Sequence, residues 1–170
     1  GIDQDCDGSW GALADARGLD GMVIEMAAAN GIPVRALEPY DTLFSIFGKM
    51  PAEDQIEMIR TTLAMDGQAV DMAVTLADAY FAEDSRVIWE LLQDQALNLP
   101  GYTPERVATE FALMEESLMS TRNRSWIPVL EQATAEGPVF AAFGALHLSG
   151  RDGVLALLER AGWRLERLPL

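Results

Sequence analysis

The chain has few of the side chains from which reactive or cross-linked sites are usually built. Its 170 residues contain one cysteine, Cys6, and one histidine, His147. A single cysteine excludes a disulfide bond within the chain. The sequence has no CxxC pair, no glycine-rich phosphate loop and no nucleophile elbow. A catalytic metal held by several histidines of this chain is therefore excluded.

Basic residues are also scarce, with 12 Lys and Arg against 27 Asp and Glu and a formal net charge of −15. Binding to nucleic acid needs a basic surface that neutralises phosphates, so we expect no nucleic-acid partner. Anionic membrane surfaces are disfavoured for the same reason. No apolar run approaches the roughly 20 residues that cross a bilayer, so we expect no transmembrane segment in this chain.

The composition, 49% hydrophobic and 23% charged, is that of a globular protein, and the length fits one domain. After an irregular opening segment, residues 22–29 are rich in helix formers and are followed by Asn30-Gly31, which is typical of a helix end. Residues 33–37 predict a short apolar strand, and Glu38 follows at its carboxyl end.

The middle of the chain, residues 42–135, has amphipathic stretches of helical period and no strand alternation. Thr103-Pro104-Glu105 supplies an N-cap, a first-turn proline and a first-turn acid, which is the clearest helix start. The helices that we predict here cover residues 52–65, 70–82, 84–93, 104–119 and 123–136.

The C-terminal part predicts a strand at 139–143, a helix at 152–161 and a final strand at 163–166, as in a βαβ unit. We therefore predict an α/β fold. Residues 1–41 and 136–170 would supply part of a parallel or mixed sheet, and 42–135 would be a large all-helical insertion. Because so few strands make a thin sheet, we expect residues 1–170 to be the C-terminal portion of a larger single α/β domain.

Two candidate site residues follow predicted strands. His147 and Glu38 each lie just past a strand's carboxyl end, where open α/β sheets place ligand and catalytic groups. An imidazole and a carboxylate at one rim make a reasonable pair for a divalent cation, although a catalytic metal usually takes three protein ligands. The alternative is a histidine that packs beside a tight glycine turn.

The polar step from Thr121 to Trp126 falls between two predicted helices. Arg122 or Arg124 could clamp a carboxylate or stabilise developing negative charge there. The alternative is a solvated helix junction in which Trp126 anchors the core. A weaker candidate is the Asp3-x-Asp5-x-Asp7-Gly8 pattern, which matches the first half of a calcium loop but lacks the final glutamate.

Three stretches of the sequence resemble the TraB/PrgY/GumN family, to which the Tiki proteases are related. The stretches are residues 139–150 (VFAAFGALHLSG) with 153–158 and Gly162-Trp163, then Arg122-Asn123 running to Pro128, and Leu37-Glu38 followed by residues 50–56.

The resemblance implies an α/β fold like that of ChaN-like haem-binding and erythromycin-esterase proteins. It also implies metal-dependent peptidase chemistry built on two Gly-x-x-His motifs and a glutamate. Gly144 to His147 matches the second motif and Glu38 the glutamate. The first motif belongs to an N-terminal half, which we expect to precede Gly1 as a missing partner of this segment.

We therefore hypothesise a metal-dependent, peptidase-like hydrolase that acts on a peptide or small molecule. His147 and Glu38 would be ligands of a divalent transition metal, or Glu38 a general base, and Arg122 and Asn123 would orient or stabilise the oxyanion. The alternative is a non-catalytic protein that binds haem or a peptide, with methionine-rich helices as an adaptable groove. A homo-oligomer is a further option, and the resemblance implies an extracytoplasmic location.

Overall fold

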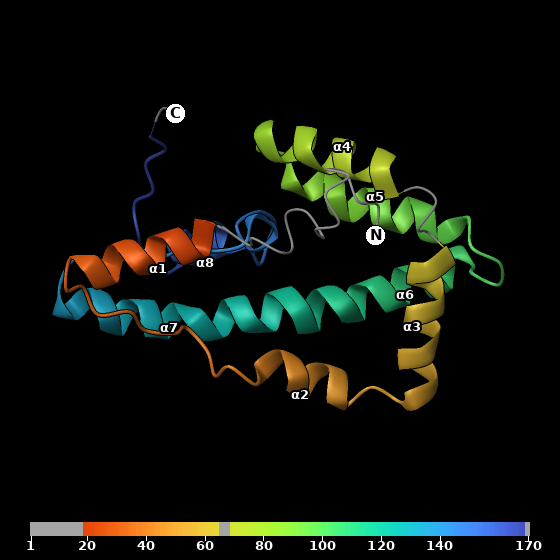
Figure 1. The fold of residues 1–170 in the computed structure, drawn as a ribbon, viewed down its shortest axis with the longest axis horizontal. Helices are drawn as coiled ribbons and strands as arrows, with labels where there is room; N and C mark the ends of the chain where they lie inside the picture. The colour runs from red at the N-terminus through yellow and green to blue at the C-terminus, as the bar shows by residue number, and fades with distance from the viewer. Residues whose placement is uncertain (1–18, 65–68, 169–170) are drawn as a thin grey trace, which may run out of the picture. The chain divides into compact units, whose positions relative to one another are not determined.

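The computed structural model describes residues 19–64 and 69–168, and all the regular elements within these ranges are helical (Figure 1). The elements are α1 (Leu19–Ala29), α2 (Thr42–Gly48), α3 (Ala52–Ala64), α4 (Ala69–Phe81), α5 (Ser85–Leu97), α6 (Pro104–Glu115), the π-helical turn η3 (Glu116–Ser120), α7 (Thr121–Glu136), the 3₁₀ turn η4 (Ala145–His147) and α8 (Val154–Arg160).

The chain forms two compact units, Gly1–Ala36 and Leu37–Leu170. In the first, α1 ends at the predicted place, because Gly31 adopts a left-handed conformation with φ of 65°. The amide of Ile32 then donates to the carbonyl of Ala27 at 2.9 Å, which satisfies an otherwise unpaired carbonyl of the last turn. The other helices belong to the second unit.

The predicted α/β fold is wrong, because the described residues contain no strand and no sheet. Residues 33–37, 139–143 and 163–166 have no helical or strand assignment. An apolar run of strand length becomes a strand when a neighbour completes its hydrogen-bond ladder, and the described part of the chain offers these segments no such neighbour. The helical character predicted for 42–135 is confirmed by α2 to α7. The assignment of the whole chain to one domain stays a prediction.

Helices α4, α5 and α6 follow one another through short turns, with α5 packed against both of its neighbours (Figure 1). Trp89 of α5 meets Phe111 of α6 edge to face, with ring centroids 5.5 Å apart. Ala96 and Val107 are buried in the same part of the unit. These contacts fix α5 against the long helical segment that carries the candidate site.

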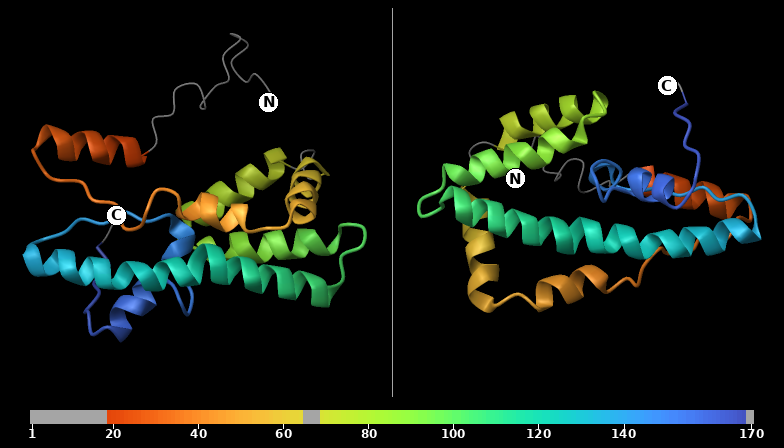
Figure 2. Two further views of the ribbon diagram at one scale, coloured as in Figure 1. Left: turned by 90° about the horizontal axis from the view of Figure 1, so that it is seen from below. Right: turned by 180° about the vertical axis from the view of Figure 1, so that it is seen from behind.

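That long segment is α6, η3 and α7, which run on as a single rod in every view (Figures 1 and 2). It begins at the predicted N-cap, where the Thr103 hydroxyl accepts a hydrogen bond from the Arg106 amide at 3.2 Å. The predicted break near Thr121 does not occur. The polar step has neither glycine nor proline to end a helix, and the π turn lets the backbone continue with a local change of register.

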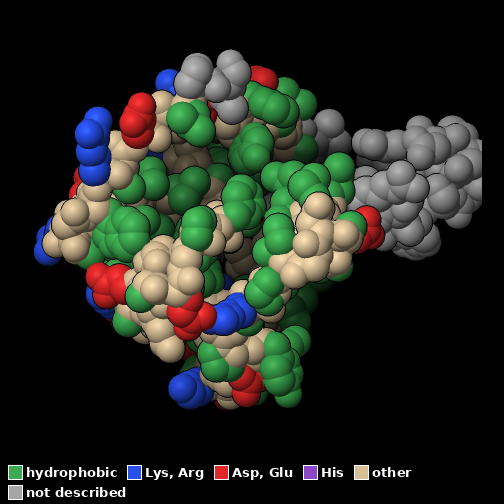
Figure 3. All heavy atoms as spheres, turned by 90° about the vertical axis from the view of Figure 1, so that its left-hand side faces the viewer, with side chains coloured by type: hydrophobic (Ala, Val, Ile, Leu, Met, Phe, Trp, Pro, Cys, Tyr) green, Lys and Arg blue, Asp and Glu red, His purple; other side chains and the backbone are tan. Residues whose placement is uncertain are grey.

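The core of the second unit is small, and much apolar surface lies outside it. Trp126, Ile127 and Leu130 of α7 are buried, as is Val154 at the start of α8, which packs against α7. By contrast, Phe140 keeps 78% of its surface exposed. Figure 3 shows hydrophobic side chains gathered at the surface of the face that it draws.

Within the described residues, no helix combines the length and the apolar character needed to cross a bilayer. The acidic pattern from Asp3 to Gly8 lies outside the described residues.

Candidate functional site

The four residues singled out from the sequence come together in the second unit. Arg122 and Asn123 lie in the first turn of α7, His147 ends the η4 turn, and Glu38 lies in the segment before α2. Glu38 and Arg122 are 84 positions apart in the chain and are in direct contact. The fold therefore assembles one polar cluster from three separate segments, without a sheet to align them.

Glu38 is held by the Arg122 guanidinium and by Trp126. Arg122 Nη2 donates to Oε1 at 2.6 Å, and Nε lies 3.2 and 3.1 Å from the two carboxylate oxygens. Trp126 Nε1 donates to Oε2 at 3.1 Å. These hydrogen bonds, that of Arg122 first, lower the pKa of Glu38 below its usual value despite partial burial. Glu38 is therefore an ionised, fully engaged carboxylate.

The remaining guanidinium nitrogen of Arg122, Nη1, contacts two groups. It donates to the carbonyl of Leu118 in the π turn at 2.8 Å and lies 3.5 Å from His147 Nε2. Only 14% of the Arg122 side chain and 19% of the Glu38 side chain are exposed. A bidentate ion pair with so little solvent access is held more firmly than a surface pair.

Asn123 fixes the orientation of His147. Asn123 is 2% exposed, and its Nδ2 donates to the Asp152 carbonyl at 2.8 Å and to the His147 carbonyl at 3.4 Å. This leaves Oδ1 to accept from His147 Nδ1 at 2.6 Å. The network thus assigns the proton to Nδ1 and leaves the lone pair of the neutral ring on Nε2.

The imidazole of His147 is kept neutral. Burial and, next, the Arg122 cation lower the pKa of His147 below 6.5, while Glu38 opposes part of this effect. At neutral pH the ring therefore presents Nε2 as a proton acceptor or metal ligand beside a guanidinium.

Trp126 is both a buried core residue, as one of the alternatives from the sequence predicts, and a member of the polar cluster. Its ring lies 4.7 Å from the His147 ring and 5.2 Å from the Arg122 guanidinium carbon, measured to ring centroids. It therefore contacts three members of the cluster at once. The available signal was its spacing on α7, since Trp126 lies four residues after Arg122 and hence on the same helix face.

In the loop after His147, position 153 has no room for a side chain, so only glycine fits there without a shift of the backbone. A Cβ at Gly153 would lie 2.3 Å from the Ser149 carbonyl oxygen and 2.5 Å from that of Leu148. This tight turn brings the Asp152 carbonyl to Asn123. Gly144, the motif glycine, differs, because a Cβ there would meet the His147 ring at an ordinary 3.6 Å.

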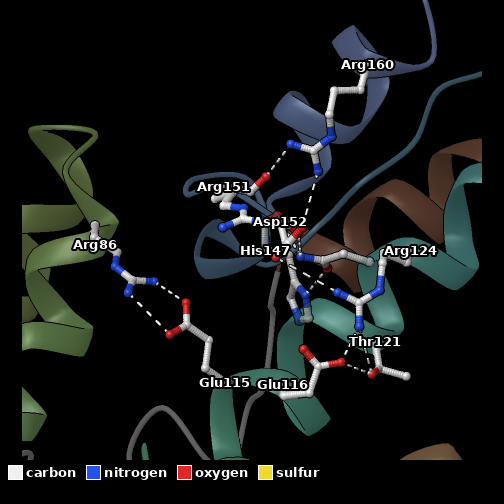
Figure 4. A network of polar contacts seen from close by, with 10 residues as sticks. Arg86, Glu115, Glu116, Thr121, Arg124, His147, Arg151, Asp152 and Arg160 are labelled. Carbon is white, nitrogen blue, oxygen red and sulfur yellow. Dashed lines mark hydrogen bonds and ion pairs between the residues drawn. The ribbon is translucent and has the colours of Figure 1, made fainter. Parts of the chain in front are cut away.

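Further ion pairs surround the cluster (Figure 4). Arg124 pairs with Glu116, so it does not take part in the Glu38 clamp. Arg86 pairs with Glu115 at 2.5 Å, and Arg160 with Asp152 at 3.2 Å. These pairs tie α5 to the end of α6, η3 to the start of α7, and α8 to the loop that precedes it.

A cavity of about 470 Å³ lies beside Asn123, between α5, the end of α6, η3 and the loop that follows η4. Asn123 forms part of its wall and also holds His147, so the cavity and the imidazole share one side chain. Its lining residues are Arg86, Trp89, Ala112, Glu115, Glu116, Met119, Ser120, Asn123, Leu146, Ser149, Gly150, Arg151, Asp152 and Gly153.

The predicted pair of metal ligands fits a divalent ion only in part. His147 suits the task in its orientation, because Asn123 holds Nδ1 as in metal-bound histidines, but the lone pair of Nε2 faces Arg122 Nη1 at 3.5 Å. Glu38 does not, because Arg122 and Trp126 occupy both carboxylate oxygens. The described residues contain no group of three or more acidic, cysteine or histidine side chains placed to hold a metal.

The fold and the cluster define a helical protein with a Gly-x-x-His turn set against an Arg-Asn helix start. The model of the TraB/PrgY/gumN family matches residues 9–167, and the chain belongs to this family. No curated protein and no solved structure matches the chain.

Proposed function

We propose that this chain is a peptidase-like hydrolase in which His147 accepts a proton from the attacking water. The observation that carries the proposal is the hydrogen bond from His147 Nδ1 to Asn123, which leaves Nε2 unprotonated, with Arg122 Nη1 3.5 Å away. Neutral imidazole beside a fixed cation is a suitable arrangement for activating water and for stabilising negative oxygen.

The proposed hydrolysis involves two proton transfers through His147. A water proton passes to Nε2 of His147 while the water oxygen bonds to the substrate carbonyl carbon. The carbonyl oxygen becomes negative, and the charge of Arg122 stabilises it. The protonated imidazole then gives its proton to the leaving amine as the carbon–nitrogen bond breaks. In this scheme His147 serves as base and then as acid.

Glu38 is better suited to positioning Arg122 than to accepting a proton. Its pKa is lowered by the Arg122 hydrogen bonds, and a carboxylate that holds its charge so firmly is a weak base. Asn123 is likewise engaged at both ends of its amide, so its part is to orient His147 rather than to bind an oxyanion.

The divalent transition metal that the family resemblance implies is a separate proposal. His147 Nε2 would be its ligand from the described residues and would let the ion act as a Lewis acid. Glu38 would be available only after leaving Arg122. For this reason none of the steps above passes through a metal.

A screen of quenched fluorescent peptides tests the proposal. We expect His147→Ala to abolish hydrolysis and Arg122→Gln to reduce it by a factor on the order of 100. Arg60→Gln is the matched control, since Arg60 is an exposed arginine of α3 and should leave activity unchanged. Equal turnover by wild type and His147→Ala would rule out the proposal.

A non-catalytic ligand-binding protein is the second candidate, and the cavity beside Asn123 favours it because its volume is that of a small-molecule site. Haem binding, visible as a new absorbance band, without any peptide hydrolysis would select this candidate over the hydrolase. Hydrolysis that depends on His147 would reject it.

Partners and location are further proposals. We propose a peptide or small-molecule substrate, an N-terminal half of the same protein as partner, and an extracytoplasmic location. Exposed apolar side chains such as Phe44 and Phe140 favour a covering partner, because large apolar patches are unusual on monomers. Light scattering after size exclusion tests self-association. A dimer would indicate that a second copy of the chain, rather than an N-terminal half, covers these apolar side chains.

A further inference from the structure

The cavity beside Asn123 is lined by a hydroxyl that has no hydrogen-bond partner among the described residues. Ser120 lines this cavity and is 7% exposed. Its hydroxyl makes no hydrogen bond with any other group in the described ranges. A hydroxyl that lines a cavity and has no partner in the protein is available to a bound molecule.

The cavity also has one cation whose charge is not balanced. Its acidic residues each have an arginine: Glu115 has Arg86, Glu116 has Arg124 and Asp152 has Arg160. Glu90 acts on Arg86 from a longer distance. By contrast, the Arg151 guanidinium is exposed and has no carboxylate partner among the described residues; the dashed line that reaches Arg151 in Figure 4 ends on its backbone carbonyl, which accepts from Arg160. An unpaired arginine suits an anion, above all a carboxylate, whose two oxygens can accept hydrogen bonds from two guanidinium nitrogens.

The rest of the lining is apolar on one side. Trp89 of α5, Met119 of η3 and Leu146 of η4 contribute to this wall, and Ala112 completes it. A cavity of about 470 Å³ is large enough for an amino-acid residue with part of its neighbour. An apolar wall, a free hydroxyl and an unpaired cation together fit a molecule with an apolar side chain next to a carboxylate.

We propose that this cavity is a subsite for the C-terminal residue of a peptide, with its side chain on the apolar wall. Arg151 would pair with the terminal carboxylate and the Ser120 hydroxyl would donate to it. Because Asn123 borders the cavity and holds His147, a peptide seated here lies next to the proposed base. The inference rests on the proposed function in taking the ligand to be a peptide substrate.

Binding of two small probes to the 170-residue chain tests the subsite separately from turnover. N-acetyl-leucine carries the apolar side chain and the carboxylate, and N-acetyl-leucinamide is its neutral counterpart. We expect calorimetry to show about five-fold tighter binding of the acid, the scale of one solvent-accessible ion pair. Arg151→Gln should remove this preference, and Arg60→Gln should keep it.

The histidine provides a second readout. Because His147 is the one histidine of the chain, its ring signals in NMR spectra are unambiguous. We expect N-acetyl-leucine to shift them in wild type through Asn123. Unchanged ring signals at saturating probe would overturn the placement of the ligand beside this network.

The outcomes separate the two proposals. Equal binding of acid and amide, or a preference that survives Arg151→Gln, overturns the subsite even if hydrolysis depends on His147. A preference that disappears in Arg151→Gln, combined with hydrolysis that is indifferent to His147→Ala, supports the subsite and overturns the proposed function alone.

Discussion

His147 Nδ1 and Asn123 Oδ1 lie 2.6 Å apart, and this contact decides which nitrogen of the ring carries the proton. The amide cannot turn over, because its Nδ2 donates to the carbonyls of Asp152 and of His147 itself. Helix α7 therefore sets the protonation pattern of a residue 24 positions further along the chain.

Replacing Asn123 by alanine should release the ring and destabilise the fold. The Asp152 carbonyl and His147 Nδ1 would both lose a partner in a poorly solvated place, at a cost of about 2–3 kcal/mol. Chemical denaturation measures that loss. Nitrogen-15 shifts of the His147 ring should change from one tautomer to a mixture, and an unchanged pattern would contradict the assignment.

The role of Trp126 can be separated into its N–H group and its ring. Trp126→Phe keeps an aromatic ring but removes the hydrogen bond to Glu38, so we expect a loss of about 1 kcal/mol and a higher pKa for Glu38. Trp126→Ala should cost about 3–5 kcal/mol, because it also leaves a cavity in the core. Urea unfolding measures both values. An unchanged stability of Trp126→Phe would show that the indole N–H contributes nothing, and equal losses would show that the ring contributes nothing beyond the N–H.

Acidification should destabilise the protein through His147. Its pKa is lowered in the folded state, so the unfolded chain binds a proton first as pH falls below about 6.5. The stability contributed by the neutral ring is therefore present above that pH and is lost below it. Glu38, whose pKa is also lowered, adds a further loss below about pH 4.5. Unfolding midpoints between pH 7.5 and 5.5 should fall for wild type and stay flatter for His147→Gln.

The two glycines near His147 should respond differently to alanine. Gly153→Ala places a methyl group against two backbone carbonyl oxygens, so we expect a loss of about 2–4 kcal/mol or a rearranged loop. Gly144→Ala meets the imidazole at an ordinary distance and should cost less than about 1 kcal/mol. Thermal unfolding of both variants checks the contrast, which would fail if Gly144→Ala were the more damaging change.

Glu38 and Arg122 should show strong coupling in a double-mutant cycle. Removing either partner alone leaves a partly buried charge, with an expected loss of about 3 kcal/mol, reduced from the fully buried case by residual solvent access. The double variant Glu38→Gln/Arg122→Gln should cost less than the sum. The exposed pair Arg106–Glu110 is the control, where we expect much weaker coupling. Additive losses at Glu38 and Arg122 would contradict the geometry.

Local signals in the sequence were sufficient to predict most of the helices. The Thr103 cap and the Asn30-Gly31 end act within one turn, so their effects can be read from neighbouring residues. The continuation through Thr121 was missed, because a π turn depends on packing around it rather than on a residue preference. The strands were wrong because an extended segment needs a partner to become part of a sheet, and no local pattern supplies one.

The sequence by itself singled out His147, Glu38 and Arg122 as candidate site residues, since these polar side chains stand out in otherwise apolar or helical stretches, and the family resemblance added Asn123. Only the tertiary structure decided their relations. It paired Glu38 with Arg122 rather than with His147, and it placed Trp126 against all three. The physical reason is that pKa values, tautomers and ion pairs depend on distances of a few ångströms between residues far apart in the chain, and packing alone sets those distances.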